Sequence, residues 1–467
     1  MSKNFRPYQI DELYILPPDI REWLAPGHLA LFVSDVVDGF DLGAILSVYG
    51  KGTGSGMPPY HPAMMVKLLM YGYCIGKTSS RKIERATYDE VPFRVLAANQ
   101  HPDHDTLAGF RKQHLKALAG LFQQILRMAG QMGMVKLGNL AVDGTKIKAN
   151  ASKHKAMSYQ RMVEAEARLK QEVEALLSGA AQVDAAEDQA HGRGKSDHDL
   201  PAELRRRETR LAKIAEAKSA LEEQAKEMAG IEAEAARQRI AERQGQERET
   251  GKKTRGKDPE VPVPEQAKPE AKAQRNFTDP ESRIMLDGAS KGFEQCYNAQ
   301  AAVDGAHQII VAAAVTQHPN DKKELVPMMA LVEQNAGCLP ENTLADSGYF
   351  SEANVTHPNL ADTRLLIPPS RQKHGQKVEL PAVDLNVPET AADGMRRKLA
   401  TASGKAAYAL RKTIVEPVFG QIKQARGFRR FSLRGLSNVA SEWQFVCAMH
   451  NLLKIFRSAK PIPLRLA

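Results

Sequence analysis

A stretch rich in Ala, Glu, Lys, Arg and Gln, over residues 153–245, most limits what this chain can fold into. Apolar side chains recur in it at a seven-residue spacing, in two series: Met162, Leu169 and Leu176, then Ile214, Leu221 and Met228. Such spacing is typical of helices that pair along their length. The polar segment GRGKSDHD between the two series is typical of a break. The pattern therefore predicts an inserted antiparallel helical hairpin that resembles a coiled coil.

The segment after the hairpin, residues 246–275, has no aromatic side chain and is rich in Pro, Lys and Glu. A segment of this composition buries too little apolar surface to offset the entropy lost on ordering. We therefore expect a flexible linker here.

The segments on either side of this insertion are richer in strand signals. LGNLAVDGTKIKAN, from Leu137, predicts a strand, and two β-rich runs joined at Asp304-Gly305 predict a hairpin. A helix capped at Asn320-Asp321, a strand ending at Asp346, a short helix, the strand TRLLIPPS and two C-terminal helices follow, and residues 371–400 are loop-like. Without the insertion, the order is strand, strand, strand, helix, strand, helix, strand, helix. That order predicts a mixed α/β, RNase H-like fold.

The charge of the chain favours a polyanionic partner. Its formal net charge is +10 and its pI is near 9.2, although a merely basic enzyme also has such values. Residues 1–135 are expected to be mostly helical, and a DNA-binding role and a solvated charged face both explain their cations: Lys77, Arg81, Lys82, Arg85, Arg111 and Lys112.

Several other classes of protein are disfavoured. The four cysteines form no CxxC pair, which is typical of a reducing cytosol rather than of a zinc finger or a disulfide framework. No uninterrupted apolar run approaches the length of a membrane span. Gly76-Lys77-Thr78 imitates a phosphate-binding loop, but Tyr71 stands where that motif needs glycine, so we expect no nucleotide cofactor.

Three acids are candidates for a metal site, because hard carboxylate oxygens suit Mg²⁺ or Mn²⁺. Asp143 lies in the first predicted strand, Asp346 ends the fourth, and Glu416 lies on the helix after the last strand. Two such ions can clamp the attacking and leaving oxygens of a phosphodiester. Each acid also has a structural alternative, respectively a turn, a helix cap and an exposed helical glutamate. Asp304 and Asp321 are interpreted as a turn residue and an N-cap.

Three blocks of sequence carry a family resemblance: LAVDGTKIKANAS, TLADSGYF and YALRKTIVEPVFGQIKQARGFRRFSLRG. Together with YHPAMMVKLLMYGYCIGKTSSRKIE and HPDHDTLAGFRKQH near the N-terminus, the chain resembles bacterial insertion-sequence transposases of the DDE class. The group with a Tyr-Arg-Glu-Lys signature around the third acid is the closest match. The resemblance implies that Asp143, Asp346 and Glu416 are catalytic and hold two Mg²⁺ or Mn²⁺ ions.

The signature maps onto Tyr408, Arg411, Glu416 and Lys423. Four residues separate Arg411 from Glu416 where the familiar signature has three, so either Lys412 takes the place of the arginine or the local helix differs. Pro417 follows Glu416 directly, which predicts a kink or a helix start there.

Cations around the third acid are expected to neutralise DNA phosphates, and Tyr408 is either a base-stacking or a core aromatic. The residues predicted to contact DNA are Lys146, Tyr408, Arg411, Lys412, Lys423, Arg426, Arg429 and Arg430. Because Lys423 follows Glu416 by about two helical turns, both can face one groove.

The predicted organisation has five parts. These are an N-terminal helical DNA-binding domain over 1–135, the first strand of a catalytic core over 136–152, the hairpin over 153–245, the linker over 246–275, and the remainder of the core with the C-terminal helices over 276–467. The resemblance implies a bacterial, nucleoid-associated cytoplasmic enzyme that binds the inverted ends of its element, cleaves there and joins the 3′ ends to target DNA. Heptad spacing suggests a homodimer in the DNA complex. The alternatives are an inactive or domesticated DNA-binding protein and an RNase H-like nuclease without strand transfer.

Overall fold

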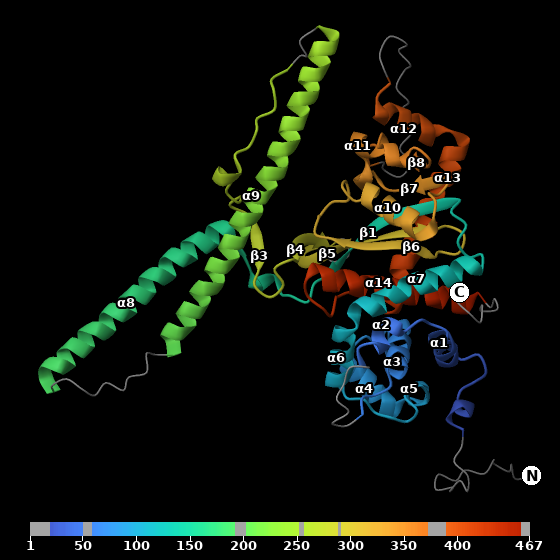
Figure 1. The fold of residues 1–467 in the computed structure, drawn as a ribbon, viewed down its shortest axis with the longest axis horizontal. Helices are drawn as coiled ribbons and strands as arrows, with labels where there is room; N and C mark the ends of the chain where they lie inside the picture. The colour runs from blue at the N-terminus through green and yellow to red at the C-terminus, as the bar shows by residue number, and fades with distance from the viewer. Residues whose placement is uncertain are drawn as a thin grey trace, which may run out of the picture. The chain divides into compact units, whose positions relative to one another are not determined.

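The computed structural model describes residues 19–49, 58–191, 202–251, 256–287, 291–371 and 389–458 (Figure 1). The chain divides into two compact units. Unit 1 comprises Met1–Ile147 and Tyr297–Ala467, and unit 2 comprises Lys148–Cys296. Among the described residues, no helix combines the length and the apolar character that a membrane span requires.

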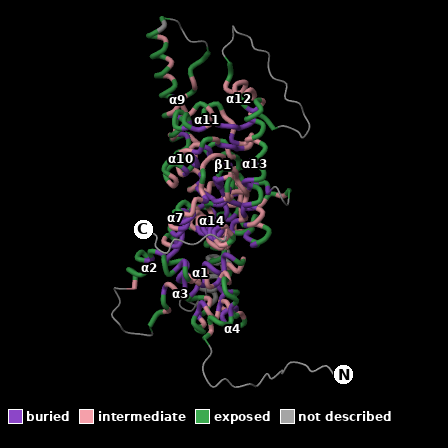
Figure 2. Tube along the Cα trace, turned by 90° about the vertical axis from the view of Figure 1, so that its right-hand side faces the viewer, coloured by how far each residue is buried: buried purple, intermediate pink, exposed green. Residues whose placement is uncertain are grey.

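The N-terminal part of unit 1 is helical, as the sequence predicts. Its helices are α1 Leu29–Asp38, α2 Gly43–Leu46, α3 Pro62–Cys74, α4 Ser80–Asp89, α5 Val91–Leu96, α6 His104–Gln113 and α7 Leu115–Gln131, with a 3₁₀ turn at Ile20–Trp23. The sequence predicts a separate domain here, but α3 and α7 share a core with the C-terminal helix α14 (Leu436–Arg457). Figure 2 shows buried residues gathered around α14. The buried residues of α7 form one broad apolar face, as expected of a helix that packs on a core with its opposite side exposed.

The sheet of unit 1 is mixed. Its strands are β1 Asn139–Lys148, β5 Gly292–Asp304, β6 Ile310–Thr316, β7 Asn342–Leu344 and β8 Arg364–Leu366, in the order β6-β5-β1-β7-β8. The pair β5–β6 is antiparallel, whereas β7 runs parallel to both β1 and β8. Asp304 ends β5, and its carboxylate accepts hydrogen bonds from Leu137 and Ala306 backbone amides, in keeping with its predicted turn role.

Helices pack on this sheet and complete the core of unit 1. They are α10 Leu325–Ala336, α11 Glu352–Val355, α12 Ala391–Ala400, α13 Ala402–Gly420 and α14, with 3₁₀ turns at Ser347–Tyr349 (η5) and Pro358–Leu360. Both α10 and α14 pack on β6. A loop was predicted over 371–400, but its last part is helical in the structure: α12 forms there and is capped by Thr390. Residues 372–388 of that predicted loop lie outside the described residues.

The predicted N-cap at Asp321 is wrong. Helix α10 begins at Leu325, and its N-cap position is Glu324. Pro327 gives the physical reason, because this start places the proline in the first turn, where its missing N–H costs no helical hydrogen bond. A helix capped by Asp321 would place the same proline in its interior.

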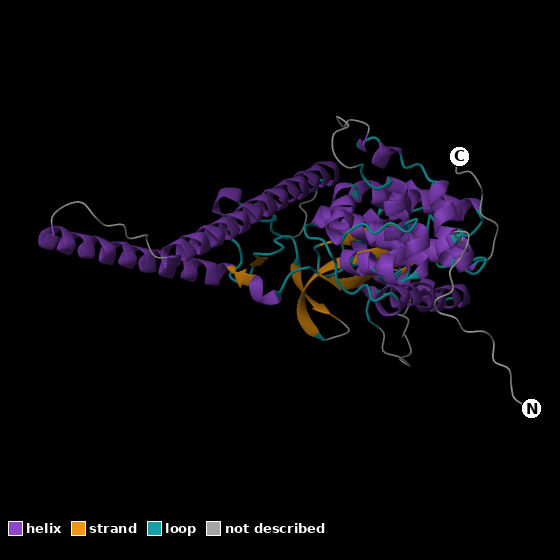
Figure 3. Cartoon of the chain, turned by 90° about the horizontal axis from the view of Figure 1, so that it is seen from below, coloured by secondary structure: helices purple, strands orange, loops and turns teal. Residues whose placement is uncertain are grey.

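Unit 2 is built around two long helices, α8 Tyr159–His191 and α9 Ala202–Thr250 (Figure 3). They are antiparallel, since Glu166 pairs with Lys218 at 2.8 Å and Glu172 pairs with Arg207 at 3.0 Å. Four heptad residues are buried between them: Met162, Leu169, Ile214 and Leu221. The predicted break at GRGKSDHD lies outside the described residues.

The last apolar residue of each heptad series is not buried between the helices. Leu176 is only half-buried and Met228 is exposed. Beyond Met228, α9 instead buries three small side chains, Ala229, Ala233 and Ala236. The chain after α9 lies along this small-residue face of the helix: the 3₁₀ turn Pro264–Gln266 packs on α9.

The expected linker also differs from the structure. Residues 246–250 belong to α9, and the Arg243 guanidinium donates to the carbonyls of Gly256 and Lys257 at 2.9 and 2.8 Å. Strand β3 (Gln274–Asn276) then pairs antiparallel with β2 (Ala156–Ser158), and β4 (Arg283–Asp287) pairs with the first residues of β5. A polar composition did not prevent this packing, because a neighbouring helix supplies the apolar surface that the segment lacks.

Candidate active site

Asp143 lies in the middle of β1, directly after three fully buried apolar residues. Its Oδ1 accepts from the Gly144 amide at 2.8 Å, and its Oδ2 lies 3.1 Å from Nη1 of Arg411 on α13. Both side chains are largely buried, with 20% and 10% of their surfaces exposed. Asp143 is therefore a strand residue in a charged pair, rather than a turn residue.

The electrostatic surroundings of Asp143 oppose its ionisation. Its pKa is raised to about 6, because burial and the nearby carboxylates of Asp346 and Asp321 raise it by more than Arg411 and the Gly144 amide lower it. A cluster of carboxylates in a partly desolvated place is stabilised by positive charge, and in this structure Arg411 provides it.

Asp346 lies two residues beyond β7. The parallel register aligns Leu344 with Ala141, so the same register continued by two residues leads to Asp346 and Asp143. The Asp346 carboxylate accepts from the Gly348 amide at 2.8 Å and caps η5, whereas Ser351 caps α11. The acid that ends β7 thus keeps only part of its hydrogen-bonding capacity for a ligand.

Asp321 joins this cluster, and sequence reasoning missed it. Its Oδ1 accepts from Asn298 Nδ2 and from Gln300 Nε2, each at 2.7 Å, and lies 3.9 Å from Lys146 Nζ. A Cβ on Gly144 would lie 2.7 Å from Asp321 Oδ1. The alternation of Asn298 and Gln300 along β5 was an available signal, because two polar residues spaced by two on an apolar strand face the same side and need polar partners.

Glu416 lies on α13 with Arg411, and its charge acts on Arg411, as the charges of Asp143 and Asp346 also do. Its side chain is exposed on α13, beside the buried Val415. Within the described residues, no three His, Cys, Asp or Glu side chains are grouped as a metal ion would need. Asp346 and Asp321 nevertheless lie near enough to Asp143 for their charges to act on it, and Glu416 interacts with Arg411, the partner of Asp143.

Pro417 stands inside α13, and a π-helix, Gln421–Ala425, follows the helix directly. Because proline has no N–H, the Thr413 carbonyl loses its intrahelical donor, and Gln308 Nε2 donates to it at 2.8 Å instead. The expected irregularity after Glu416 therefore appears as a helix with an interior proline that ends in a π-turn.

Besides Arg411 and Lys146, which face carboxylates, two more of the predicted DNA contacts interact within the protein. Lys423 Nζ donates to Thr145 Oγ1 at 3.0 Å and to the Lys146 carbonyl at 3.1 Å, which ties the π-helix to β1. Tyr408 is half-buried and hydrogen-bonds to Arg411, so it is neither a core aromatic nor a fully exposed one.

Arg426 needs correction as a DNA contact. It is buried, it donates to the Gln421 and Val446 carbonyls, and burial lowers its pKa. Arg111 of the N-terminal helices is likewise buried, donating to Tyr73 Oη and the Thr78 carbonyl. Neither side chain can reach a phosphate from these positions. Three of the predicted cations are exposed: Lys412, Arg429 and Arg430.

Two family models match the chain. A transposase domain (DUF772) covers residues 18–113, and a transposase DDE domain covers residues 370–456. The chain carries the domains of an insertion-sequence DDE transposase. Such domains imply an enzyme that processes nucleic acid, with DNA as its partner. No curated protein and no solved structure matches the chain. The DDE match contains Glu416, whereas Asp143 and Asp346 lie outside both matches.

Proposed function

We propose that this transposase binds the inverted ends of its element, cleaves them and joins the 3′ ends to target DNA, using an RNase H-like core. The strand order supports this fold: from one edge the sheet holds the third, second, first, fourth and fifth core strands in chain order. The observation that carries the proposal is the pairing of β1 with β7, which directs Asp143 and Asp346 to one edge of a parallel strand pair.

The donor set fits divalent cations. Burial raises the pKa of Asp143 to about 6, and the charge of Asp346 contributes to this rise, so the two carboxylates lie close together. Carboxylate oxygens are the ligands that Mg²⁺ and Mn²⁺ prefer. These two acids would hold the ions, with Glu416 as the third ligand that the family resemblance assigns. Two bound ions would supply Lewis-acid activation of the attacking hydroxyl and stabilisation of the leaving oxygen.

Other residues of this chain support the candidate metal site in three ways. Arg411 neutralises Asp143 at 3.1 Å and keeps the carboxylate cluster folded before DNA binds. Asn298 and Gln300 hold Asp321 beside the two candidate ligands, which makes Asp321 a positioning residue. Lys412, Arg429 and Arg430 are exposed on and after α13, where they can contact backbone phosphates without reading sequence.

The test uses DNA that flanks the gene, with and without Mg²⁺, and the variants Asp143→Asn, Asp346→Asn and Glu416→Gln. Glu333→Gln, on the exposed face of α10, is the matched control for loss of one carboxylate. We expect each of the three variants to lose cleavage while still binding DNA, and the control to cleave normally. Mn²⁺ binding to the free protein, followed by electron paramagnetic resonance, should weaken in the Asp143 and Asp346 variants.

Each of the other outcomes would contradict one part of the proposal. Full cleavage by one variant removes that residue from the catalytic set. Cleavage without joining identifies a nuclease, and DNA binding without any cleavage by the unmodified protein identifies an inactive DNA-binding descendant. The proposed homodimer is tested by light scattering on paired ends, where a single copy per complex would exclude it.

A further inference from the structure

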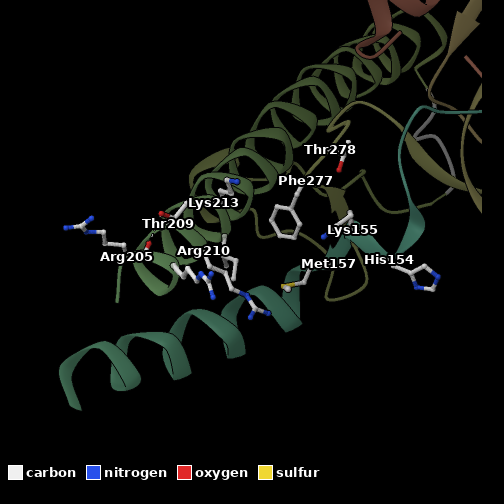
Figure 4. Close-up of a pocket in the computed structure, with 12 residues that line it drawn as sticks. His154, Lys155, Met157, Arg205, Thr209, Arg210, Lys213, Phe277 and Thr278 are labelled. Atoms are coloured by element: carbon white, nitrogen blue, oxygen red, sulfur yellow. Dashed lines mark hydrogen bonds between the residues drawn. The ribbon is translucent and has the colours of Figure 1, made fainter. Parts of the chain in front are cut away.

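Unit 2 contains a cationic pocket that the proposed catalytic chemistry does not use. The pocket has a volume of about 690 Å³, within the range of roughly 300–1,000 Å³ that is usual for ligand sites. It lies between the first turns of α9, the segment leading into α8, and the residues that follow β3 (Figure 4). Five Arg or Lys residues and one histidine line it, and none of its lining residues is acidic.

The cations on α9 form a continuous face of the helix. Arg206, Arg210 and Lys213 follow one another at spacings of four and three residues, which places them on the same side. Like charges at this spacing destabilise a helix slightly unless an anion binds to them. Two neighbouring cations on α9, Arg207 and Lys218, are paired with glutamates of α8.

Three of the pocket cations have no such carboxylate partner among the described residues. In the described part of the chain, no carboxylate lies within ion-pair distance of Arg206, Arg210 or Lys213. Their positive charge is therefore available to a bound anion.

An apolar wall lies beside these cations. Phe277 and Met157 are partly buried and pack against the hairpin core, and Ile214 is fully buried behind them. Figure 4 shows the Phe277 ring between α9 and the segment that carries Lys155 and Met157.

The position of Phe277 is built by backbone pairing. The β2–β3 register aligns Ala156 with Asn276, and the Phe277 amide donates to the Lys155 carbonyl at 3.0 Å. Asn276 Nδ2 donates to the Ser152 carbonyl at 2.8 Å and holds the two segments together. An aromatic ring and a lysine are thus fixed next to each other.

We propose that this pocket, lined by Arg206, Arg210, Lys213, Lys155, Phe277 and Met157, is a second DNA site that binds an unpaired nucleotide. The α9 cations would neutralise consecutive phosphates, and the base would stack on Phe277. Cations along a groove with an aromatic platform are the features by which proteins hold single strands without reading their sequence. A duplex offers its phosphates but keeps its bases stacked, so the pocket favours DNA with a single-stranded end. This inference rests on the proposed function, because it requires DNA as the partner.

The test is fluorescence anisotropy of the full chain in EDTA, so that no cleavage occurs. The probe is a duplex from the DNA flanking the gene, either blunt or with a 3′ single-stranded overhang, over a series of salt concentrations. The variants are Arg206→Ala with Arg210→Ala, and Phe277→Leu. Arg237→Ala with Arg239→Ala is the control, since it removes two exposed arginines from the same helix away from the pocket.

We expect the Arg206/Arg210 double variant to bind about tenfold more weakly and to lose about two units from the slope of log affinity against log salt, since each phosphate contact contributes about 0.9. The control should match the unmodified protein. Phe277→Leu should keep the salt slope and lose the preference for the overhang. Circular dichroism should show unchanged helix content in all variants.

Two results would overturn the inference alone. One is equal affinity and slope for the two double variants, and the other is an Arg206/Arg210 variant that changes self-association without changing DNA affinity, which would identify a protein interface. Failure of the unmodified protein to bind either probe would instead refute the proposed function.

Discussion

Gly144 is the position where one added methyl group should disable the acid cluster. Its φ is not in the left-handed region, so alanine fits the backbone and only the surrounding space matters. A Cβ there would lie 2.7 Å from Asp321 Oδ1 and 2.9 Å from Asn298 Oδ1, and would also meet Gln300 Nε2. Ordinary contacts begin at 3.4 Å, so Asp321 must retreat by about 0.7 Å, the difference from 2.7 Å.

The cost of Gly144→Ala has two parts. Overpacking a closely packed site costs about 1–3 kcal/mol. Retreat of Asp321 also weakens its hydrogen bonds from Asn298 and Gln300, and losing one charge-assisted bond costs about 1.5–3 kcal/mol. We therefore expect the free energy of unfolding to fall by about 3 kcal/mol or more, and Mg²⁺-dependent cleavage to be lost while DNA binding remains.

Urea unfolding followed by tryptophan fluorescence measures this loss. Trp443 is fully buried and its Nε1 donates to the Gln300 carbonyl at 2.9 Å, so its emission reports on the strand that holds Asp321. The only other tryptophan, Trp23, is 42% exposed and can be replaced by phenylalanine in every variant. Gly138→Ala is the control, since a Cβ there meets nothing within 4 Å.

A double-mutant cycle with Asp321→Ala isolates the contact. If Asp321 is the group displaced, Gly144→Ala should cost less in that background, with a coupling of about 1–3 kcal/mol. Equal stability of Gly144→Ala and Gly138→Ala, with cleavage at the unmodified rate, would refute the arrangement of Asp321 against β1.

Two further predictions concern α14. His450 is buried, its Nε2 donates to the Gln308 carbonyl, and burial lowers its pKa from 6.5 to about 3. Between these two pH values the unfolded chain binds a proton that the folded chain does not. The free energy of unfolding, which is at its full value above pH 6.5, should therefore fall by about 2 kcal/mol at pH 5. Unfolding midpoints at pH 7 and pH 5 should show this loss, and His450→Gln should show less of it. The Glu442 carboxylate accepts hydrogen bonds from the Ser432 and Leu433 amides. Glu442→Ala should lower the free energy of unfolding by about 3 kcal/mol, because two partly buried donors lose their acceptor. An effect no larger than that of Glu442→Gln would contradict this.

Periodicity and strand signals predicted the elements that carry Asp143 and Asp346, because both acids adjoin short apolar runs. The sequence pattern for β7 also placed Asp346 at the end of a strand, and the parallel pairing with β1 turns that position into proximity. The hairpin was predicted where its heptads bury side chains, at Met162 and Leu221. The heptad pattern did not predict the packing of the second half of α9 against the segment that follows it, since Met228 is exposed there and alanines are buried instead.

What the sequence could not provide was the identity of partners distant along the chain. Nothing local distinguishes Arg426, which is buried, from Arg429, which is exposed, and only two residues stand between them. Asp321 was assigned to a cap because a cap is the commonest role for an acid before a helix. Only Pro327, which fixes the start of α10, contradicted that role in advance.

Gln300 explains how the acid cluster depends on the C-terminal part of the chain. It is fully buried, an unusual place for a glutamine unless all its polar groups are paired. Its Nε2 donates to Asp321, its Oε1 accepts from the Tyr349 hydroxyl, and its carbonyl accepts from Trp443. The carboxylate site on β1 is thereby linked through one residue of β5 to η5 and α14. A change in the packing of α14 should therefore alter the position of Asp321 without any residue of α14 touching DNA.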